Sequence, residues 1–503
     1  MAEGAVGASW PSLPSLRCRV YVASLPSVSF EEKLSRIRQS SPNHLAYASS
    51  HSAWAEHHYS SELWLQRALR NHPWTVASAS EAELVFIAAN FSQACYAAKP
   101  FTAMRMWREM LELLWQANQS LAHADAASTP NKTVQRPPKP GPLLSREPFT
   151  APKALSMQYM ACRPWSGSVV PHDLLVLSEF ARQTHLREWR PSPFVISAPA
   201  WLVGTAPPPP SLPWAHRKLL FFAGHVPKLS IDRTRFVLWT ALRHHRSRVT
   251  IASHTINCTI GQFEVCAEGL PALRQRPSTF FSSHCKPYCG VNANCHGDPA
   301  LSSARNARGL WKRCQAYKRV NYSQLMPHIR RDSARRLSSR EYLGEAMGHR
   351  FCVVARGDFQ ATPKITEMVA IGGVGGCLPL FVFTRPLRQE ISSSYPYASW
   401  LDYCEIGYFV SIRKAARDVG ALLDAIEALP VEEIAQKRQA LQKLAQTGAF
   451  VHRQATMGRP SASDWKLGEL CSMAKARKER VGNRTGGEEI LLPRGGDYSR
   501  CTL

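Results

Sequence analysis

The stretch from residue 351 to residue 380 contains the side chains best suited to binding an anionic ligand. Apolar runs typical of strands open and close it, and a turn and a helix N-terminus are expected between them. A turn of this kind offers backbone N–H groups and basic side chains to a phosphate. The residues that we expect to contact a phosphate-bearing ligand there are Arg356, Gly357, Thr362, Lys364 and Glu367.

Some of these residues also have structural interpretations. Lys364 and Glu367 are three positions apart, so on a helix they would share a face and could form an ordinary ion pair. Thr362 precedes the expected helix and could cap its N-terminus, a role that is compatible with a phosphate contact. The glycines between 372 and 376 would let the backbone approach a ligand closely.

The elements that must position these residues alternate between strand and helix. The apolar pattern predicts strands within 17–24, 81–88, 174–177, 194–196, 218–224, 351–354 and 378–383. It predicts helices over 61–70, 101–121, 233–243 and 413–447. A proline-rich run at 207–213 separates two such series. This alternation on both sides of a hinge indicates an α/β protein with two doubly wound, Rossmann-type domains that face a cleft.

The expected boundaries follow from the same pattern and from local composition. Residues 1–16 are predicted to be a flexible N-terminus, and 122–153, rich in Pro, Ala, Ser and Lys, an exposed loop. The two domains would span 17–205 and 206–455, the second with a cysteine-rich insertion at about 253–330. Residues 456–503 are polar and basic, and we expect a loosely held tail there.

The charge of the chain favours an anionic partner. Its 503 residues include 62 Lys and Arg against 37 Asp and Glu, a formal net charge of +25. Nucleic acid, a phosphorylated ligand, an acidic polysaccharide and a membrane surface would all suit this balance. The sequence has no zinc-finger, aromatic RNA-binding or helix-turn-helix pattern, which argues against nucleic acid.

The 14 cysteines suggest an oxidising compartment. Cys285, Cys289 and Cys295 lie close together, so we expect a disulfide-pinned insertion; a zinc site is the alternative, without a CxxC pair or paired histidines to favour it. Several Asn-x-Ser/Thr sequons point the same way. No signal peptide is visible, and no run approaches the roughly 18 apolar residues of a membrane span. Either the protein is soluble or the sequence lacks its true N-terminus.

Short motifs in a fixed order carry a family resemblance. In the C-terminal half they are FFAG at 221–224 with Arg235 beyond it, Tyr342 and Met347, FCV at 351–353, ARGD at 355–358, GCLPL at 376–380, LDY at 401–403 and FV at 409–410. Weaker matches in the N-terminal half are VYV at 20–22, AELVFI at 82–87, and Trp165 with His172 and Asp173. Together, over roughly residues 18–450, they resemble the exostosin-type glycosyltransferases of plant and algal cell walls.

The resemblance implies a GT-B fold and an inverting transfer of a sugar to a polysaccharide or to a glycoprotein glycan. Residues 17–205 would then be the acceptor side, and 206–455 would bind the nucleotide-sugar donor, which we expect to be a UDP-sugar. No metal and no other cofactor is expected. Cationic side chains must therefore meet the diphosphate charge, and Arg235 joins Arg356 and Lys364 as a candidate. Glu367 would accept hydrogen bonds from the ribose hydroxyls.

An inverting transfer also needs a general base for the acceptor hydroxyl. Our candidates are His172 and Asp173, which end a loop before a strand, and Glu62. The resemblance further implies a Golgi membrane location and a hetero-complex with other glycosyltransferases as an additional partner.

Two other functions are kept as alternatives. The chain departs from the family pattern because Ala355 replaces a proline, Lys364 replaces an arginine and about four residues, mostly glycine, are inserted after Glu367. These departures suit a catalytically inactive member that acts as a complex partner. A nucleic-acid-binding protein is the third hypothesis, and it rests on the net charge.

Overall fold

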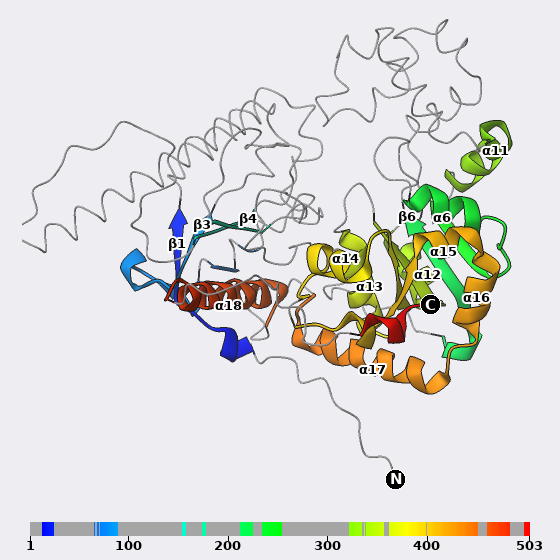
Figure 1. Cartoon of the computed structure of the whole chain (residues 1–503). Helices are drawn as coiled ribbons and strands as arrows, with labels where there is room; N and C mark the ends of the chain where they lie inside the picture. The colour runs from blue at the N-terminus through cyan, green and yellow to red at the C-terminus, as the bar shows by residue number, and fades with distance from the viewer. Residues whose placement is uncertain are drawn as a thin grey trace, which may run out of the picture. The chain divides into compact units, whose positions relative to one another are not determined.

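In the computed structural model, the chain divides into two compact units. Unit 1 comprises residues 1–195 with 454–490, and unit 2 comprises 196–453 with 491–503. The residues that the structure describes are 13–24, 65, 68–69, 71–88, 153–156, 174–177, 212–224, 234–253, 321–333, 337, 339–356, 362–398, 400–450, 460–482 and 497–503. Figure 1 shows their helices and strands.

Unit 1 contains a parallel sheet of five strands in the order β2-β1-β3-β4-β5. The strands are β1 (Val20–Ser24), β2 (Thr75–Val76), β3 (Leu84–Ala88), β4 (Lys153–Ser156) and β5 (Leu174–Leu177). The strands expected within 17–24, 81–88 and 174–177 are therefore confirmed. β2 and β4 were not expected, and β4 begins where the sequence suggested an exposed loop.

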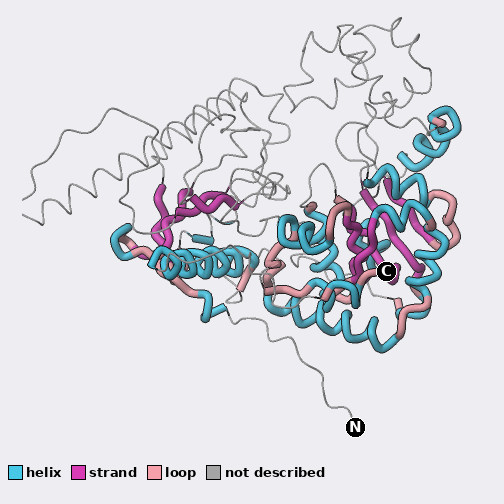
Figure 2. Tube along the Cα trace, viewed as in Figure 1, coloured by secondary structure: helices cyan, strands magenta, loops and turns pink. Residues whose placement is uncertain are grey.

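Helix α18 (Ala462–Gly482) belongs to unit 1, although the sequence suggested a loosely held tail there. A disulfide joins Cys471 of this helix to Cys18, and the Lys475 ammonium donates to the carbonyl of Arg17 at 2.6 Å. Figure 2 shows α18 beside the strands of this unit. The tail prediction is wrong for this segment because apolar residues hidden among its charges are buried: Ala462, Trp465, Leu467, Leu470, Cys471 and Ala474.

The first described turn of the chain also packs on α18. This turn is the 3-10 helix η1 (Leu13–Leu16), at the end of the segment expected to be a flexible N-terminus. A Cβ at Gly468 would lie 3.0 Å from the Cβ of Leu16, so the two backbones approach closely there. The α18 residue Asp464 accepts from the His72 ring at 2.9 Å, a further contact that holds this helix in unit 1.

Unit 2 contains a second parallel sheet of five strands, in the order β10-β9-β8-β6-β7. The strands are β6 (Lys218–Gly224), β7 (Val249–Ser253), β8 (His349–Ala355), β9 (Leu378–Phe383) and β10 (Tyr408–Ser411). Numbered within each unit, both sheets have the order 2-1-3-4-5 of doubly wound folds. The α/β class expected from the sequence is confirmed.

The helices of unit 2 cover both faces of its sheet. They are α6 (Thr234–Leu242), α11 (Tyr322–Ser333), α12 (Ser339–Met347), α13 (Pro363–Gly373), α14 (Leu387–Ser394), α15 (Ile412–Arg417), α16 (Val419–Glu427) and α17 (Val431–Thr447). β6 leads to β7 in one direction, whereas β8 leads to β9 and β10 in the other. Right-handed crossovers therefore place α6 and α13 on opposite faces. Accordingly, α6 contacts α15, and α13 contacts α17 (Figure 1).

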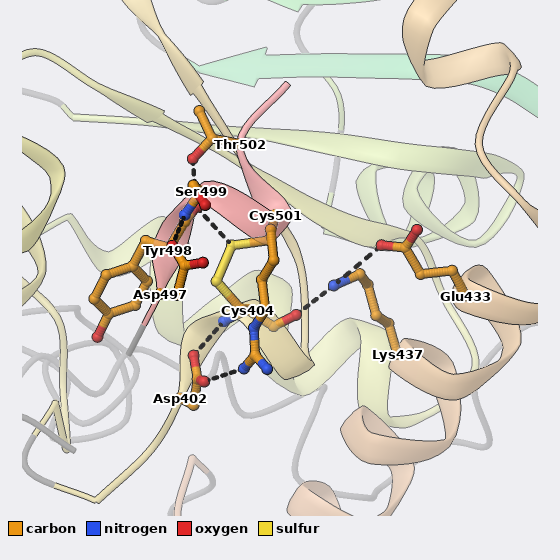
Figure 3. Close-up of a disulfide and its surroundings, with 10 residues drawn as sticks. Asp402, Cys404, Glu433, Lys437, Asp497, Tyr498, Ser499, Cys501 and Thr502 are labelled. Atoms are coloured by element: carbon orange, nitrogen blue, oxygen red, sulfur yellow. Dashed lines mark hydrogen bonds and ion pairs between the residues drawn. A yellow bond between two sulfur atoms is a disulfide. The ribbon is translucent and has the colours of Figure 1, made fainter. Parts of the chain in front are cut away.

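The last described residues of the chain close the β10 edge of this sheet. Leu503 N donates to the Phe409 carbonyl at 2.8 Å, and a disulfide joins Cys501 to Cys404. Figure 3 shows the surroundings of this disulfide, where the Lys437 ammonium bonds the Cys404 carbonyl. An extra chain along the outer strand covers backbone groups that an edge would otherwise expose.

Several expectations lie outside the described residues. They are the helix at 101–121, the strand at 194–196, the prolines at 207–210 and the cysteines of the expected insertion. The expected helix at 413–447 is three helices, because Asp418 caps α16 and Pro430 precedes α17. Within the described ranges, no helix is both long and apolar enough to cross a membrane.

Candidate functional site

The sheet of unit 2 has its topological switch point between β6 and β8. The chain leaves β6 toward β7 on one side and leaves β8 toward β9 on the other. The helices that follow these two strands, α6 and α13, therefore begin on opposite sides of the sheet. In open α/β sheets, ligands bind outside the carboxyl ends of the strands at such a point.

Arg235, in the first turn of α6, lies across the switch point. Its Nε and Nη2 atoms are 3.4 and 3.3 Å from the carbonyl oxygen of Ala355, the last residue of β8. Nη2 also donates to Thr362 Oγ1 at 3.3 Å. The guanidinium packs beside Gly224, where an added Cβ would be 3.5 Å from Arg235 Nη1. The glycine of the FFAG motif thus adjoins the arginine of the following helix.

Thr362 is the N-cap of α13. It has extended backbone angles, its side chain accepts from Lys364 N, and Pro363 occupies the first helical position. A threonine N-cap followed by proline favours a helix start at this place in the sequence. The Thr362 side chain is 3% exposed and faces Arg235. A cation and the positive end of a helix dipole therefore meet, an arrangement that an anion would stabilise.

Lys364 and Glu367 form the ion pair that their spacing allowed, with Lys364 Nζ 2.7 Å from Glu367 Oε2. Lys364 Nζ also donates to the hydroxyl of Tyr342, on α12, at 2.6 Å. The Tyr342 hydroxyl in turn hydrogen-bonds Glu367. The three side chains thus form a closed network beside the N-terminus of α13.

Burial dominates the proton affinities of this network. Burial lowers the pKa of Lys364. The positive charge of Arg235 lowers it further, and the negative charge of Glu367 opposes this shift without cancelling it. Burial raises the pKa of Tyr342 well above its ordinary value, and the charge of Glu367 acts in the same direction. The Tyr342 hydroxyl therefore stays protonated and can donate a hydrogen bond to the Glu367 carboxylate. The effect of Arg235 on both pKa values places its charge close to this network.

Arg356 extends from the end of β8 toward the β9 side. Its Nη1 donates to Thr384 Oγ1 at 2.9 Å. The Thr384 amide and hydroxyl both lie 3.3 Å from an oxygen of Glu390, a carboxylate that is 2% exposed. Burial raises the pKa of Glu390, while its bonds from Thr384 and the charge of Arg356 lower it. Arg235 thus lies beside the end of β8 on the β6 side, and the Arg356 side chain extends to the β9 side.

The glycine cluster has a different role from the expected one. A Cβ at Gly373 would be 2.4 Å from Ala445 Cβ, and one at Gly372 would be 2.7 Å from a methyl carbon of Leu441. The cluster therefore lets α13 and α17 pack closely, and Gly375, with φ of 92°, makes the turn that follows. It lies at the C-terminal end of α13, away from Thr362. The idea of close backbone approach to a ligand was wrong because another helix occupies that space.

The structure thus brings Arg235, Thr362, Lys364 and Glu367 together and directs Arg356 to the other side of β8. Gly357, His172, Asp173 and Glu62 lie outside the described residues. Sequence reasoning did not assign Tyr342, Thr384 or Glu390 to the site. Thr384 had a usable signal, because it follows the end of β9 directly, at the same edge of the sheet as Arg356.

No family model and no curated protein sequence matches this chain. Its function is therefore inferred from the side chains at the switch point. The site combines two arginines, a lysine and a paired carboxylate with the capped N-terminus of a helix. These groups are suited to a ligand that carries both a phosphate and a polyol.

Proposed function

We propose that the chain is an inverting, exostosin-like glycosyltransferase that binds the diphosphate of a nucleotide-sugar at the switch point of unit 2. The observation that carries the proposal is the meeting of Arg235 with Thr362 at the N-terminus of α13, beside Lys364. Cations and helix N–H groups directed at one point can stabilise the charge that develops on a diphosphate leaving group. Arg356 would add a further cation from the β9 side.

Glu367 is assigned to the ribose of the donor. A carboxylate offers about four acceptor positions, so bonds from Lys364 and Tyr342 leave capacity for a ribose hydroxyl. A bound diphosphate would also attract Lys364, which would weaken its hold on Glu367. The network is therefore suited to respond to a ligand that carries phosphate and ribose together.

A GT-B arrangement, with two Rossmann-type domains facing a cleft, is part of the proposal. The shared 2-1-3-4-5 strand order of the two units supports it. Unit 1 would then supply the acceptor side and the general base, for which His172 and Asp173 remain candidates. The three disulfides of the described residues suit the Golgi lumen, which belongs to the same proposal.

A second function is favoured by one observation. Lys364, Glu367 and Tyr342 bond to one another, which would also suit a purely structural network. The chain would then be an inactive family member that acts as a partner in a glycosyltransferase complex.

Calorimetric titration of UDP and GDP into the full chain separates these functions. If the proposal is right, one nucleotide binds, and Arg235→Gln and Glu367→Ala each weaken its binding about ten- to hundredfold, the usual effect of losing a charged hydrogen bond. Glu432→Gln, an exposed change on α17, is the matched control. If neither nucleotide binds the unmodified chain, the enzyme proposal fails and the partner function is favoured.

A further inference from the structure

An Asn-x-Ser sequon, formed by Asn321, Tyr322 and Ser323, lies where α11 begins. Its middle residue is not proline, and a hydroxyl follows two positions after the asparagine, as N-linked glycosylation requires. Sequons outside the described residues begin at Asn90, Asn118, Asn131, Asn257 and Asn483. The sequon at α11 is therefore the one whose surroundings the described part of the chain includes.

The side chain of Asn321 is exposed and is engaged through its oxygen. Oδ1 accepts from Gln324 N at 3.2 Å, and the backbone carbonyl accepts from Leu325 N at 3.2 Å. Because a backbone N–H can only donate, the side-chain atom beside Gln324 is the oxygen of the amide. Within the described ranges, Nδ2 has no acceptor, so Asn321 caps α11 and leaves its amide nitrogen directed to solvent.

The first turns of α11 have a buried side and an exposed side. Leu325, Met326 and Ile329 are buried, and α11 contacts β7. Ser323 and Gln324 are exposed, as is Asn321 itself. Figure 1 shows α11 at one end of unit 2. A large polar group on Asn321 would therefore extend into solvent and displace none of the three core side chains.

Disulfides favour the compartment in which such a group is added. Three of them lie among the described residues. Bonds of this kind form in the lumen of the endoplasmic reticulum, where N-linked glycans are also attached. The inference below rests on this secretory location, which belongs to the proposed function, and it does not depend on nucleotide binding.

We propose that Asn321 is an N-glycosylation site, modified by a transferase whose donor is a lipid-linked oligosaccharide diphosphate. Asn321 Nδ2 forms a bond to the anomeric carbon of the oligosaccharide, and the bond from that carbon to the diphosphate oxygen breaks. The lipid diphosphate leaves with the electron pair of that bond. Nδ2 gives up one of its two protons to a base of the transferase and keeps the other.

The folded chain is compatible with the product of this reaction. Glycans are added as the chain emerges, so the later fold has to accommodate them. Glycosylation alters Nδ2 and leaves Oδ1 in place, so the bond from Gln324 N that caps α11 persists. The modified side chain therefore keeps its structural role and adds a polar group to an exposed position.

Expression of the full chain in eukaryotic cells, behind a secretory signal that is cleaved on entry, tests the inference. Glycopeptide mass spectrometry of the purified protein measures the occupancy of Asn321. Ser323→Ala removes the hydroxyl that the sequon requires, and Ser323→Thr, the matched control, keeps one. Both changes are at an exposed position and retain the Asn321 cap, so thermal unfolding should be nearly the same in both variants.

We expect a glycan on Asn321 in the unmodified chain and in Ser323→Thr, and its loss in Ser323→Ala. Peptide N-glycosidase converts a glycosylated asparagine to aspartate, which is also a good N-cap, so this treatment should leave the unfolding temperature nearly unchanged. An Asn321 without glycan in the secreted chain would overturn the proposal, and so would a glycan that persists in Ser323→Ala.

Titration of UDP and GDP into the same preparations separates this inference from nucleotide binding. A glycan on Asn321 in a chain that binds neither nucleotide would support the modification site and count against the enzyme alone. Nucleotide binding by a secreted chain whose Asn321 is unmodified would overturn the modification site alone.

Discussion

Arg235 and Thr362 begin different crossovers of the unit 2 sheet, yet Arg235 Nη2 donates to Thr362 Oγ1 at 3.3 Å. The threonine thus serves two purposes, because the same oxygen caps α13 through Lys364 N. The side chain that starts one helix also orients the arginine of the other. Changes at Thr362 should therefore affect stability and ligand binding together.

Replacing Thr362 by alanine should lower the free energy of unfolding by about 1 kcal/mol, the usual effect of losing an N-cap. It should also weaken nucleotide binding, because Arg235 loses an acceptor. Thr362→Ser keeps the hydroxyl and should retain both properties. Urea denaturation and UDP titration measure the two effects, and a Thr362→Ala chain as stable and as tightly binding as the original would contradict this assignment.

Gly373→Ala should destabilise unit 2 by about 1–3 kcal/mol, because its new methyl group would overlap Ala445 between α13 and α17. Gly344, inside α12, offers a matched control, since a Cβ there meets nothing within 4 Å. Gly344→Ala should instead stabilise by about 0.5–1 kcal/mol. Thermal unfolding of the two variants compares them directly, and equal effects would exclude helix packing as the reason for the glycine cluster.

Glu390 should make stability depend on pH. Its pKa in the folded chain is raised from the ordinary 4.5, chiefly by burial, so the folded state binds this proton more tightly than the unfolded state. The stability that this bound proton contributes is therefore fully present below about pH 4.5, and it is lost as the pH rises through the raised pKa of Glu390. Glu390→Gln removes this titration.

The unfolding free energy of the Glu390→Gln variant, relative to the unmodified chain, should thus increase as the pH rises from about 4 toward neutrality. Denaturation curves across that range give the slope. Glu432→Gln, an exposed change, controls for the loss of charge. A difference that stays flat with pH would show that Glu390 does not titrate as its burial requires.

Removing the Cys18–Cys471 disulfide by a double serine substitution should destabilise unit 1 by about 2–4 kcal/mol. Hydrogen exchange followed by mass spectrometry would detect the loss of protection in β1, β3 and α18. The Cys404–Cys501 double variant is the matched comparison, because its loss should be concentrated around β10. If both variants expose the same segments, the disulfides do not act within separate units.

The sequence predicted the β8–α13–β9 region well because its signals are local. Apolar runs identify both strands, and Thr362 followed by Pro363 marks the helix start. The contact between Arg235 and Thr362 was not predictable in detail, since it depends on the strand order that brings β6 beside β8. The Thr384–Glu390 pair is local, and it was missed although Thr384 directly follows β9.

Other features depended on partners that are distant in sequence. The apolar residues of α18 are scattered among charged residues in the sequence. Their burial within unit 1 is therefore apparent only in three dimensions. Cys18 and Cys471 are 453 positions apart, and no spacing rule pairs such cysteines. The glycines near 373 suggested a ligand because their actual neighbour, Ala445, lies on a later helix.

The place of α18 in unit 1 has a consequence for biosynthesis. This helix follows all five strands of unit 2 in the sequence, although it packs with η1 and β3. Domains usually acquire their structure in order as the ribosome releases them, the N-terminal one first. Here the first unit to emerge must wait for its last helix until the second has been translated. Chaperones and oxidoreductases that act on nascent chains would therefore meet unit 1 unfinished, with Cys18 still unpaired.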